Sequence, residues 1–371
     1  MTEIIIGAGA SGLACAIRLK QNMPSDEVIL LERLDTVGKK ILATGNGRCN
    51  LSNEHAENYK EVINFFNNIG LKTRSDSEGR IYPYSNQATT VRDMLEKECI
   101  RLGVQIITDC TVKSVDKDLI VSSDCGMFYG DSVIIAAGGK AQSSLGSNGS
   151  GYEILKNLGH KITPLSPALV QLTSSSKYPR QLKGQRVKGN MKILLDGECV
   201  KKEYGEILFT DYGLSGSVSM NISEVVSRNF ESESPKKCHA VIDLASDFSE
   251  DELLEHISKF GSLEGIVGEK ISSLLEKQAN GDREKICKYA KNWQLIITGT
   301  KGYNFAQITS GGADLKQFNN FESVIVKNLY ACGEVLDRQF ECGGYNLNFA
   351  FYSGIKVADE ITKKRNRNDK N

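Results

Sequence analysis

The stretch from Ile4 to Glu32 constrains this fold more than any other part of the chain. It opens with a short, apolar, β-branched run that is typical of a buried parallel strand. Gly7, Gly9 and Gly12 follow and fit the pattern G-x-G-x-x-G, and the residues after Gly12 have the periodicity of a helix. A glycine pattern alone is weak, but one placed between a strand and a helix predicts the first turn of a dinucleotide-binding unit.

Each part of this unit has a physical task. Gly7 permits the tight turn out of the strand, Gly9 lets a pyrophosphate approach the backbone, and Gly12 lets the helix pack closely on the sheet. The helix N-terminus then offers unpaired N–H groups and a positive dipole end to phosphates. A second apolar run, Val28–Leu31, ends on Glu32, twenty residues beyond Gly12, where a carboxylate would bind ribose hydroxyls.

Length and charge limit the class of protein. With 371 residues the chain is long for one core, so we expect two domains. The formal net charge is zero, which argues against a dedicated nucleic-acid or anionic-membrane surface. The one strongly basic run, Lys363–Arg367, is interpreted as a solvated, frayed tail.

No secretory signal or apolar run long enough for a membrane span is visible, so we expect a cytoplasmic protein. The ten cysteines form no C-x-x-C pair and are interpreted as reduced thiols. The four histidines show no metal-ligand spacing, and no metal site is expected.

Several glycine-rich segments come later in the chain. Residues 37–53 form a long polar segment after the nucleotide-binding unit, and such loops are usually functional. Residues 132–139 predict another buried strand that ends in a Gly-Gly turn beside the cofactor. Residues 146–151 place a second glycine cluster at a helix start, which is either a phosphate or ring-edge clamp or a flexible turn. A Gly-Gly loop also opens the last helix, predicted over 346–363.

The predicted secondary structure changes near residue 165. Short alternating strands are predicted at 168–172, 185–200 and 205–210, and amphipathic helices at 250–260, 263–277 and 283–289. Strands are predicted again at 295–298, 305–309 and 323–330. The sequence therefore predicts an α/β fold in which residues 1–164 and 300–371 form one domain and residues 165–299 an inserted substrate or cap domain.

The distribution of glycine turns selects the cofactor. The nucleotide signature is N-terminal, and other glycine turns lie far away in the sequence, one near the C-terminus. A single ligand that meets all of them must be long and two-ended, which favours non-covalent FAD over NAD.

The sequence resembles the BaiN/YhiN-like flavoproteins, also described as aminoacetone-oxidase-like NAD(P)/FAD-dependent oxidoreductases. The resemblance covers nearly the whole chain. It rests on A-T-G-N-G-R-C-N and G-G-Y-N-L as the most specific runs, and on G-A-G-A-S-G, A-G-G-K, G-S-N-G-S-G-Y, G-E-I-L-F-T-D-Y-G-L-S-G, T-S-G-G-A and G-E-V-L-D. It implies a Rossmann-like FAD-binding domain in two segments, with an inserted domain that contains a β-barrel-like part and helices.

The resemblance also implies the residues that would contact the cofactor. The ADP part would be held by Gly7, Gly9, Ala10, Ser11, Gly12, Glu32 and Arg33, with Val112 and the turn Ala137, Gly138 and Gly139 close to the cofactor. The stretch from phosphate to ring would be lined by Lys39, Lys40, Gly47, Arg48, Cys49 and Asn50. Gly333, Glu334 and Asp337 would contact the ribityl and pyrophosphate region, and Gly344, Tyr345 and Asn346 the isoalloxazine edge. Three positions depart from the family pattern: Ser150, Asp211 and Ser217 stand where many relatives carry Asp, His and Pro.

No histidine or carboxylate is marked by the sequence as an acid or base. Arg48 and Tyr345 are the catalytic candidates, with phosphate binding and ring packing as their alternative roles. Three functions stay open. The first is reduction of an activated C=C or C=O bond in a small substrate with electrons from transient NAD(P)H. The second is an oxygen-using amine or ketone oxidase, and the third an FAD-dependent RNA-modifying or RNA-binding protein, which the neutral charge disfavours. The sequence does not indicate an oligomeric state.

Overall fold

The computed structural model describes residues 1–368, so the last three residues of the predicted C-terminal segment lie outside the described chain. The chain forms two compact units. Unit 1 contains residues 1–165 and the chain from Ile308 onward, and unit 2 contains residues 166–307.

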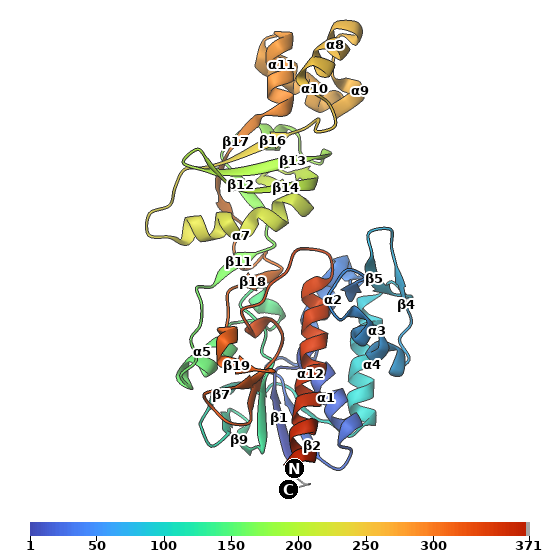
Figure 1. Ribbon diagram of the computed structural model, residues 1–371, viewed down its shortest axis with the longest axis vertical. Coiled ribbons are helices and arrows are strands. Elements are labelled where there is room, and N and C mark those ends of the chain that lie inside the picture. The colour runs from blue at the N-terminus through green and yellow to red at the C-terminus, as the bar shows by residue number, and fades with distance from the viewer. Residues whose placement is uncertain (369–371) are drawn as a thin grey trace. The chain divides into compact units, whose positions relative to one another are not determined.

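Unit 1 is built on a seven-stranded sheet with the order β19-β20-β21-β10-β1-β2-β6 (Figure 1). The five strands from β21 to β6 are parallel, and β19 and β20 add an antiparallel hairpin at one edge. The apolar run of β1 is buried on both faces, as expected for a central parallel strand. The strands are β1 (Thr2–Ile6), β2 (Glu27–Leu31), β6 (Gln105–Ile107), β10 (Ser132–Ile135), β19 (Phe318–Asn319), β20 (Glu322–Ser323) and β21 (Leu329–Ala331).

Two helices from opposite ends of the chain pack against each other in unit 1. The first, α1, follows the glycine turn, and α12 is the last helix (Figure 1). They approach so closely that a Cβ on Gly354 would lie 2.2 Å from the carbonyl oxygen of Ser11. The split domain is therefore closed by a contact that only a glycine permits. The helices of unit 1 are α1 (Ala10–Asn22), α2 (Lys39–Ala43), α3 (Tyr59–Asn68), α4 (Ala88–Arg101), α5 (Ser150–Asn157) and α12 (Tyr345–Asn368).

Two small antiparallel sheets and one further strand complete unit 1. They are β3 (Ser52–Asn53), β4 (Thr73–Ser75) and β5 (Arg80–Pro83); β7 (Val112–Val115), β8 (Ile120–Ser123) and β9 (Gly126–Tyr129); and β18 (Ile308–Ser310). Short 3-10 turns lie at 44–47, 143–145, 315–317 and 333–335.

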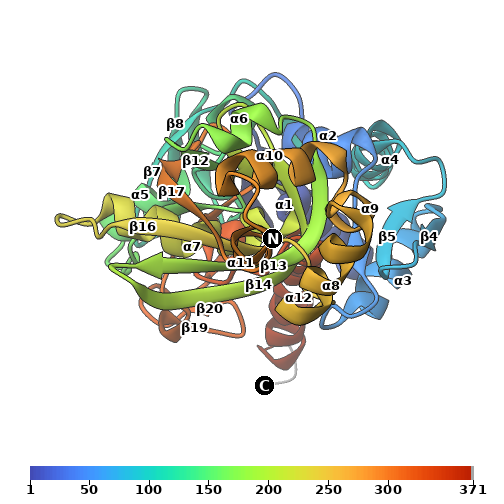
Figure 2. The same ribbon diagram turned by 90° about the horizontal axis from the view of Figure 1, so that it is seen from above.

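Unit 2 contains a closed antiparallel barrel with the order β12-β15-β14-β13-β16-β17. Residues of β17 alternate between the buried interior and the surface, so Trp293, Leu295 and Ile297 fill the barrel core. Figure 2 shows β13 and β14 as a long curved hairpin. The strands are β11 (Ser166–Ala168), β12 (Leu172–Ser174), β13 (Arg186–Leu195), β14 (Glu198–Phe209), β15 (Gly213–Ser215), β16 (Cys238–Asp243) and β17 (Trp293–Thr300).

Helices cover the rest of unit 2, and α8 to α11 gather at one end of the barrel (Figure 1). They are α6 (Tyr178–Gln181), α7 (Ser217–Glu231), α8 (Glu250–Phe260), α9 (Glu264–Val267), α10 (Glu269–Ala279) and α11 (Arg283–Lys291). The predicted fold class, a Rossmann-like domain in two segments with an inserted β-barrel-like and helical domain, is confirmed.

Several details differ from the sequence predictions. Helix α7 and strands β4, β5, β9 and β16 were not predicted, and the strand predicted over 185–200 contains the turn between β13 and β14. The helix predicted over 263–277 is broken into α9 and α10 at Gly268, whose φ of 82° no helix interior accommodates. The strand predicted over 323–330 is two short strands, β20 and β21. The basic run 363–367 is not a frayed tail but part of α12, because Lys364 pairs with Glu322 and Arg365 with Glu3 and Asp26.

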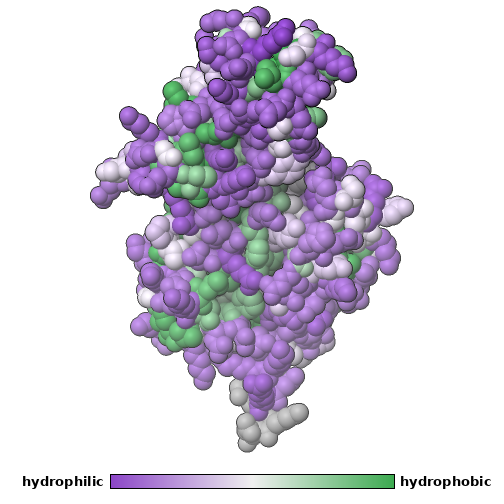
Figure 3. All heavy atoms as spheres, turned by 45° about the horizontal axis from the view of Figure 1, so that its top comes forward, coloured by the Kyte–Doolittle hydropathy of each residue, from purple (hydrophilic) through white to green (hydrophobic). Residues whose placement is uncertain are grey.

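No helix within residues 1–368 combines the length and apolar character needed to cross a membrane. Hydrophilic residues cover most of the face seen in Figure 3, and apolar residues gather there in separate patches.

Candidate cofactor site

The parallel register brings the predicted segments to one edge of the sheet. Ile6 at the end of β1 pairs with Leu31 of β2 and Ile135 of β10, and Ile135 pairs with Ala331 of β21. The segments that follow these strands therefore leave the sheet side by side. This is the edge at which α/β sheets bind their ligands.

The three glycines of the first turn have separable roles. Gly7 has a φ of 104°, and a Cβ there would lie 2.6 Å from the carbonyl oxygen of Ala136. A Cβ on Gly12 would lie 1.9 Å from the carbonyl oxygen of Gly7. No heavy atom lies within 4 Å of a Cβ built on Gly9. Gly7 and Gly12 are therefore required by packing within the protein, whereas the space beside Gly9 is open.

Helix α1 begins at Ala10 with Gly9 as its N-cap, and no side chain caps its first N–H groups. Ser11 is buried in the first turn. An uncapped N-terminus of a helix this long presents several N–H donors and the positive dipole end at one point, which is the arrangement that binds a phosphate.

Glu32 lies beside this turn. Its carboxylate accepts hydrogen bonds from the backbone N–H of Ala8 and of Leu34, both at 2.9 Å, which fix its orientation. The neighbouring Arg33 donates to the carbonyl oxygens of Ser143 and Gly146 at 3.4 and 3.3 Å, so it holds the 143–146 turn. Val112, also predicted to line the cofactor, is half-buried at the start of β7.

A hydrogen-bonded cluster joins segments that are far apart in sequence. Lys40 pairs with Glu334 at 2.8 Å, and the other oxygen of Glu334 accepts the backbone N–H of Thr309 at 2.8 Å. The Thr309 hydroxyl accepts the backbone N–H groups of Lys140 and Ala141 at 2.7 and 3.0 Å. The side chains of Lys40 and Glu334 therefore hold these loops together, and the role of Glu334 is to position backbone.

The later glycine turns are packed closely around this cluster. A Cβ on Gly139 would lie 2.4 Å from Glu334 Oε1, and one on Gly138 3.0 Å from Ser147 Oγ. The N–H of Gly149 donates to the carbonyl of Gly139 at 3.0 Å, so residues 146–151 form an ordered turn. Ala137, which precedes these glycines, packs against the first turn of α5: a Cβ placed on Gly151 would lie 3.0 Å from the Ala137 Cβ.

The turn of Gly333 meets the start of α1. A Cβ on Gly333 would lie 2.5 Å from Ser11 Oγ, and the Gly333 N–H donates to Ser353 Oγ at 2.9 Å. Asp337, further along this segment, is half-buried, and its N–H donates to the carbonyl of Ala313 at 3.0 Å.

The polar loop after α2 is strongly curved. Gly45, Asn46, Gly47 and Cys49 all have left-handed backbone, with φ between 55° and 80°. Cys49 points into the core of unit 1, and burial raises the pKa of its thiol to about 12, so the side chain packs in the interior. The loop thus presents mainly backbone groups.

Arg48 is exposed at the tip of this loop. Its guanidinium lies 4.9 Å from the centre of the Tyr82 ring, and its Nε donates to the Gly45 carbonyl at 3.2 Å. Lys39 makes only a 3.9 Å pair with the exposed Asp35. Both cations are therefore accessible for an anionic group.

The start of α12 lies against the end of the polar loop. A Cβ on Gly344 would lie 2.5 Å from the Ser52 carbonyl oxygen and 2.7 Å from Asn50 Oδ1. Asn50 Oδ1 is buried and has no hydrogen-bond partner. An unsatisfied buried carbonyl oxygen is costly, so this position would be stabilised by a ligand N–H donor.

The two residues after Gly344 behave differently. Asn346 bonds the backbone N–H and carbonyl of Phe340 at 2.9 and 2.8 Å, so its side chain is occupied and only its backbone can meet a ring edge. Tyr345 is half-buried, and burial raises the pKa of its hydroxyl. Tyr345 directly follows Gly344, whose Cβ would lie 2.7 Å from Asn50 Oδ1, whereas Arg48, two residues before Asn50 in the chain, lies against Tyr82.

These observations fit FAD. The chain provides an open, uncapped helix N-terminus beside Gly9, a fixed carboxylate at Glu32 and an unsatisfied acceptor at Asn50. The imide N–H of a flavin is a donor of the kind that Asn50 lacks.

Sequence reasoning missed the residues that hold these loops in place. Thr309 opens the T-S-G-G-A run, but the sequence assigned no role to it or to Ser353, and the hydroxyls of both accept hydrogen bonds from the backbone of the cofactor turns. Ser52 and Asn348, bonded at 2.7 Å, similarly tie α12 to the polar loop. The small Ser353-Gly354 pair beside the apolar stretch 349–352 of α12 was a signal of close packing.

A cavity of about 410 Å³ opens beside Tyr345 within unit 1. Arg338 lies at its wall, paired with Glu57 at 2.7 Å and stacked on Phe340 and Phe349, whose ring centres are 5.3 and 5.1 Å away. Its charge is therefore already compensated.

Comparison with known proteins agrees with this geometry. The family model described as HI0933-like protein Rossmann domain matches residues 1–60 and 55–360. The chain belongs to this family. The resemblance drawn from the sequence motifs is thereby confirmed, and the HI0933-like family and fold are those of FAD-dependent oxidoreductases.

Relatives of this HI0933-like protein align over nearly their full length. A protein of Clostridium scindens named 3-dehydro-bile acid delta(4,6)-reductase is 34% identical, with 94% of this chain and 96% of the relative covered. A protein of Haemophilus influenzae named ribosomal RNA dihydrouridine synthase is 26% identical, with 98% of each chain covered.

Among solved structures, 3-ketosteroid delta1-dehydrogenase from Sterolibacterium denitrificans has a TM-score of 0.56 at 11% identity, covering 98% of this chain and 100% of that one. The 3-ketosteroid-delta4-(5alpha)-dehydrogenase of Rhodococcus jostii has a TM-score of 0.53 at 15% identity, covering 97% and 96%. These similarities show the shared fold.

Proposed function

We propose that this protein reduces a carbon–carbon double bond conjugated to a carbonyl group in a small organic substrate, with electrons that NAD(P)H delivers to FAD. The observation that carries the proposal is the full-length, 34% identical relative named as a bile acid reductase, together with a glycine-lined edge that fits FAD. A double bond next to a ketone accepts a hydride because the carbonyl takes up the developing negative charge.

The first turn would hold the cofactor pyrophosphate. The N–H groups at the start of α1 donate toward the open space beside Gly9, and Glu32 lies where ribose hydroxyls would bind. Lys39 and Arg48 are accessible to compensate phosphate charge. When bound, FAD supplies the ring that accepts and passes on a hydride.

The start of α12 would set the electrostatics of the reacting end. Its N-terminal dipole favours negative charge near Tyr345 and Asn346. The Tyr345 hydroxyl is protonated at neutral pH, as an ordinary tyrosine is, and burial raises its pKa further, so it would be present as a proton donor. Asn50 would help to hold the ring through its buried, unpaired Oδ1.

Anaerobic spectroscopy tests the electron donor. The FAD-loaded protein is mixed with NADH or NADPH, and the visible flavin absorbance is followed. The proposal expects bleaching by one of them and recovery of colour on addition of an α,β-unsaturated ketone. Unchanged absorbance with both nicotinamides would remove NAD(P)H from the proposal. Release of hydrogen peroxide with a small amine in air would favour the oxidase alternative.

A second candidate keeps the chemistry and changes the substrate to a uracil base in ribosomal RNA. Two relatives carry the name ribosomal RNA dihydrouridine synthase, the H. influenzae protein and one from Escherichia coli at 28% identity. The ring double bond of uridine is also conjugated to a carbonyl.

The outer face of the β13–β14 hairpin supports this second candidate. Tyr204 is 57% exposed and pairs with Asn190. On the same face, the pair Lys192–Lys202 lies on one side of it and the pair Lys188–Glu206 on the other, with Glu206 bound to Arg186. Lysines around an exposed aromatic ring suit phosphate and base contacts. Salt-sensitive gel shifts with ribosomal RNA, weakened by Lys202→Glu but not by Lys259→Glu, would favour RNA over a small substrate. Turnover of a free enone without any RNA binding would exclude it.

A further inference from the structure

Cys110 and Cys125 form a thiol pair at the end of the β7–β8 ladder. Val112 pairs with Ser123, and the N–H of Asp124 donates to the Thr111 carbonyl at 3.1 Å. If the register is continued by two steps from the Val112–Ser123 pair, Cys110 lies directly opposite Cys125. Neighbouring residues in antiparallel pairs have Cα atoms about 4.5–5.5 Å apart, which is within the range that a disulfide spans.

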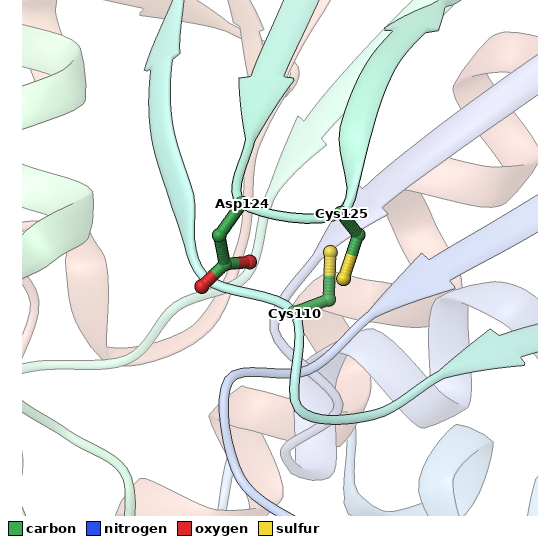
Figure 4. A group of neighbouring side chains, drawn as sticks. All are labelled: Cys110, Asp124 and Cys125. Carbon is green, nitrogen blue, oxygen red and sulfur yellow. The ribbon is translucent and has the colours of Figure 1, made fainter.

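The side chains complete this arrangement. Figure 4 shows the two sulfur atoms next to each other, and the ligand atoms of Cys110, Asp124 and Cys125 lie within 4.8 Å of one another. Cys110 is buried in the apolar core of unit 1, whereas Cys125 is exposed. An oxidant in solution therefore meets Cys125 first, with Cys110 held behind it.

We propose that Cys110 and Cys125 are a redox-modification site, in which a peroxide converts the pair to a disulfide. The Cys125 thiol is oxidised by hydrogen peroxide to a sulfenic acid, with release of one water. The Cys110 sulfur then attacks the Cys125 sulfur, the S–S bond forms, and the hydroxyl leaves with the thiol proton as a second water. Two thiols thus lose two electrons, and the peroxide O–O bond accepts them.

A metal site is the competing use of this cluster. The Asp124 carboxylate already accepts the backbone N–H of Thr111 at 2.7 Å, and the cluster offers three ligand atoms from these residues. A structural zinc site has four protein ligands in closed geometry. The facing sulfurs and the difference in their exposure therefore favour a disulfide.

The pair is connected to the cofactor edge through the backbone. The N–H of Cys110 donates to the Glu32 carbonyl at 2.9 Å, and the N–H of Asp109 to the Leu34 carbonyl at 3.0 Å. A disulfide would tie this segment to the turn between β8 and β9. We infer that it slows FAD release, a consequence that rests on the proposed function, whereas disulfide formation itself does not.

The test starts with the fully reduced, full-length protein. It is treated with a few equivalents of hydrogen peroxide, unfolded, alkylated and digested, and the peptides are identified by mass spectrometry. We expect a linked peptide pair containing Cys110 and Cys125, which dithiothreitol separates. The interaction with the neighbouring Cys110 thiol raises the pKa of Cys125 to about 11, so the oxidation should speed up as rising pH increases the fraction of thiolate.

Matched variants give the controls. Cys199 is also exposed, so Cys199→Ser should leave the cross-link unchanged, and Cys125→Ser should leave Cys110 fully alkylated. Over-oxidised Cys125 beside an alkylated Cys110, or stoichiometric binding of Zn²⁺ that is lost in Cys125→Ser, would overturn the redox site. If the disulfide forms but FAD is released at the same rate from both forms, the coupling to the cofactor is wrong and the modification site stands.

Discussion

Gly9→Val should strongly weaken FAD binding while leaving the fold intact. A Cβ on Gly9 meets no heavy atom within 4 Å, so the substitution fills open space next to the α1 N-terminus. Because no protein group is displaced, we expect the free energy of unfolding of the FAD-free protein to change by less than about 1 kcal/mol.

The loss of affinity follows from the contacts that the valine blocks. A charged phosphate hydrogen-bonded to N–H groups gains about 1.5–3 kcal/mol per bond. Loss of two such bonds costs at least about 3 kcal/mol, which weakens FAD binding by more than about a hundredfold. Titration of the FAD-free protein with FAD, followed by flavin fluorescence, measures this change.

Gly12→Ala is the matched comparison. Its Cβ would lie 1.9 Å from the Gly7 carbonyl oxygen, a backbone atom that cannot move away cheaply. We expect this smaller side chain to lower the melting temperature strongly, whereas the larger valine at Gly9 does not. Equal FAD affinity in Gly9→Val and the unchanged protein would refute the assignment of this turn to the pyrophosphate.

Three further predictions concern stability. Lys40→Met should lower the free energy of unfolding, measured by chemical denaturation, by about 1–3 kcal/mol, because it leaves the largely shielded Glu334 carboxylate without its cation. Lys39→Met removes only a 3.9 Å surface pair and should cost less than about 0.5 kcal/mol. Equal effects of the two substitutions would contradict the role of the Lys40–Glu334 pair. Arg365→Met should lower the free energy of unfolding by about 3–5 kcal/mol, because it leaves the fully buried Glu3 unpaired. Lys363→Met, on the exposed side of α12, should be nearly neutral. A small effect at Arg365 would restore the interpretation of this segment as a frayed tail. Burial lowers the pKa of His160 below its ordinary value of 6.5, so the unfolded chain binds a proton more readily than the folded chain. The free energy of unfolding should therefore fall as pH drops below about 6.5, and the fall should be shallower in His160→Gln. Parallel pH profiles of the two proteins would exclude His160 as the source of the fall.

The sequence predicted the parts of the site that depend on local pattern. The β1 turn, the position of Glu32 and the helix after Gly344 follow from short motifs, and the structure places all of them at one sheet edge or helix start. The parallel register makes this convergence a necessity once the strands are identified.

Features that depend on tertiary contacts could not be predicted in the same way. Lys40 and Glu334 are far apart in sequence, and each resembles an ordinary surface charge until the fold pairs them. Cys49 was expected to line the cofactor; its backbone is left-handed and its side chain is buried in the core, so only its backbone can do so. The end of α12 was interpreted as a solvated tail because nothing near residue 365 in the sequence indicates that Arg365 pairs with buried Glu3, near the other end of the chain.

The most direct measurement is the absorbance spectrum of the purified protein, followed by quantification of the flavin released on denaturation. Glycine turns from both ends of the chain that enclose one FAD predict a yellow protein with one FAD per chain, lost in Gly9→Val. A colourless preparation that takes up no added FAD while folded would contradict the account.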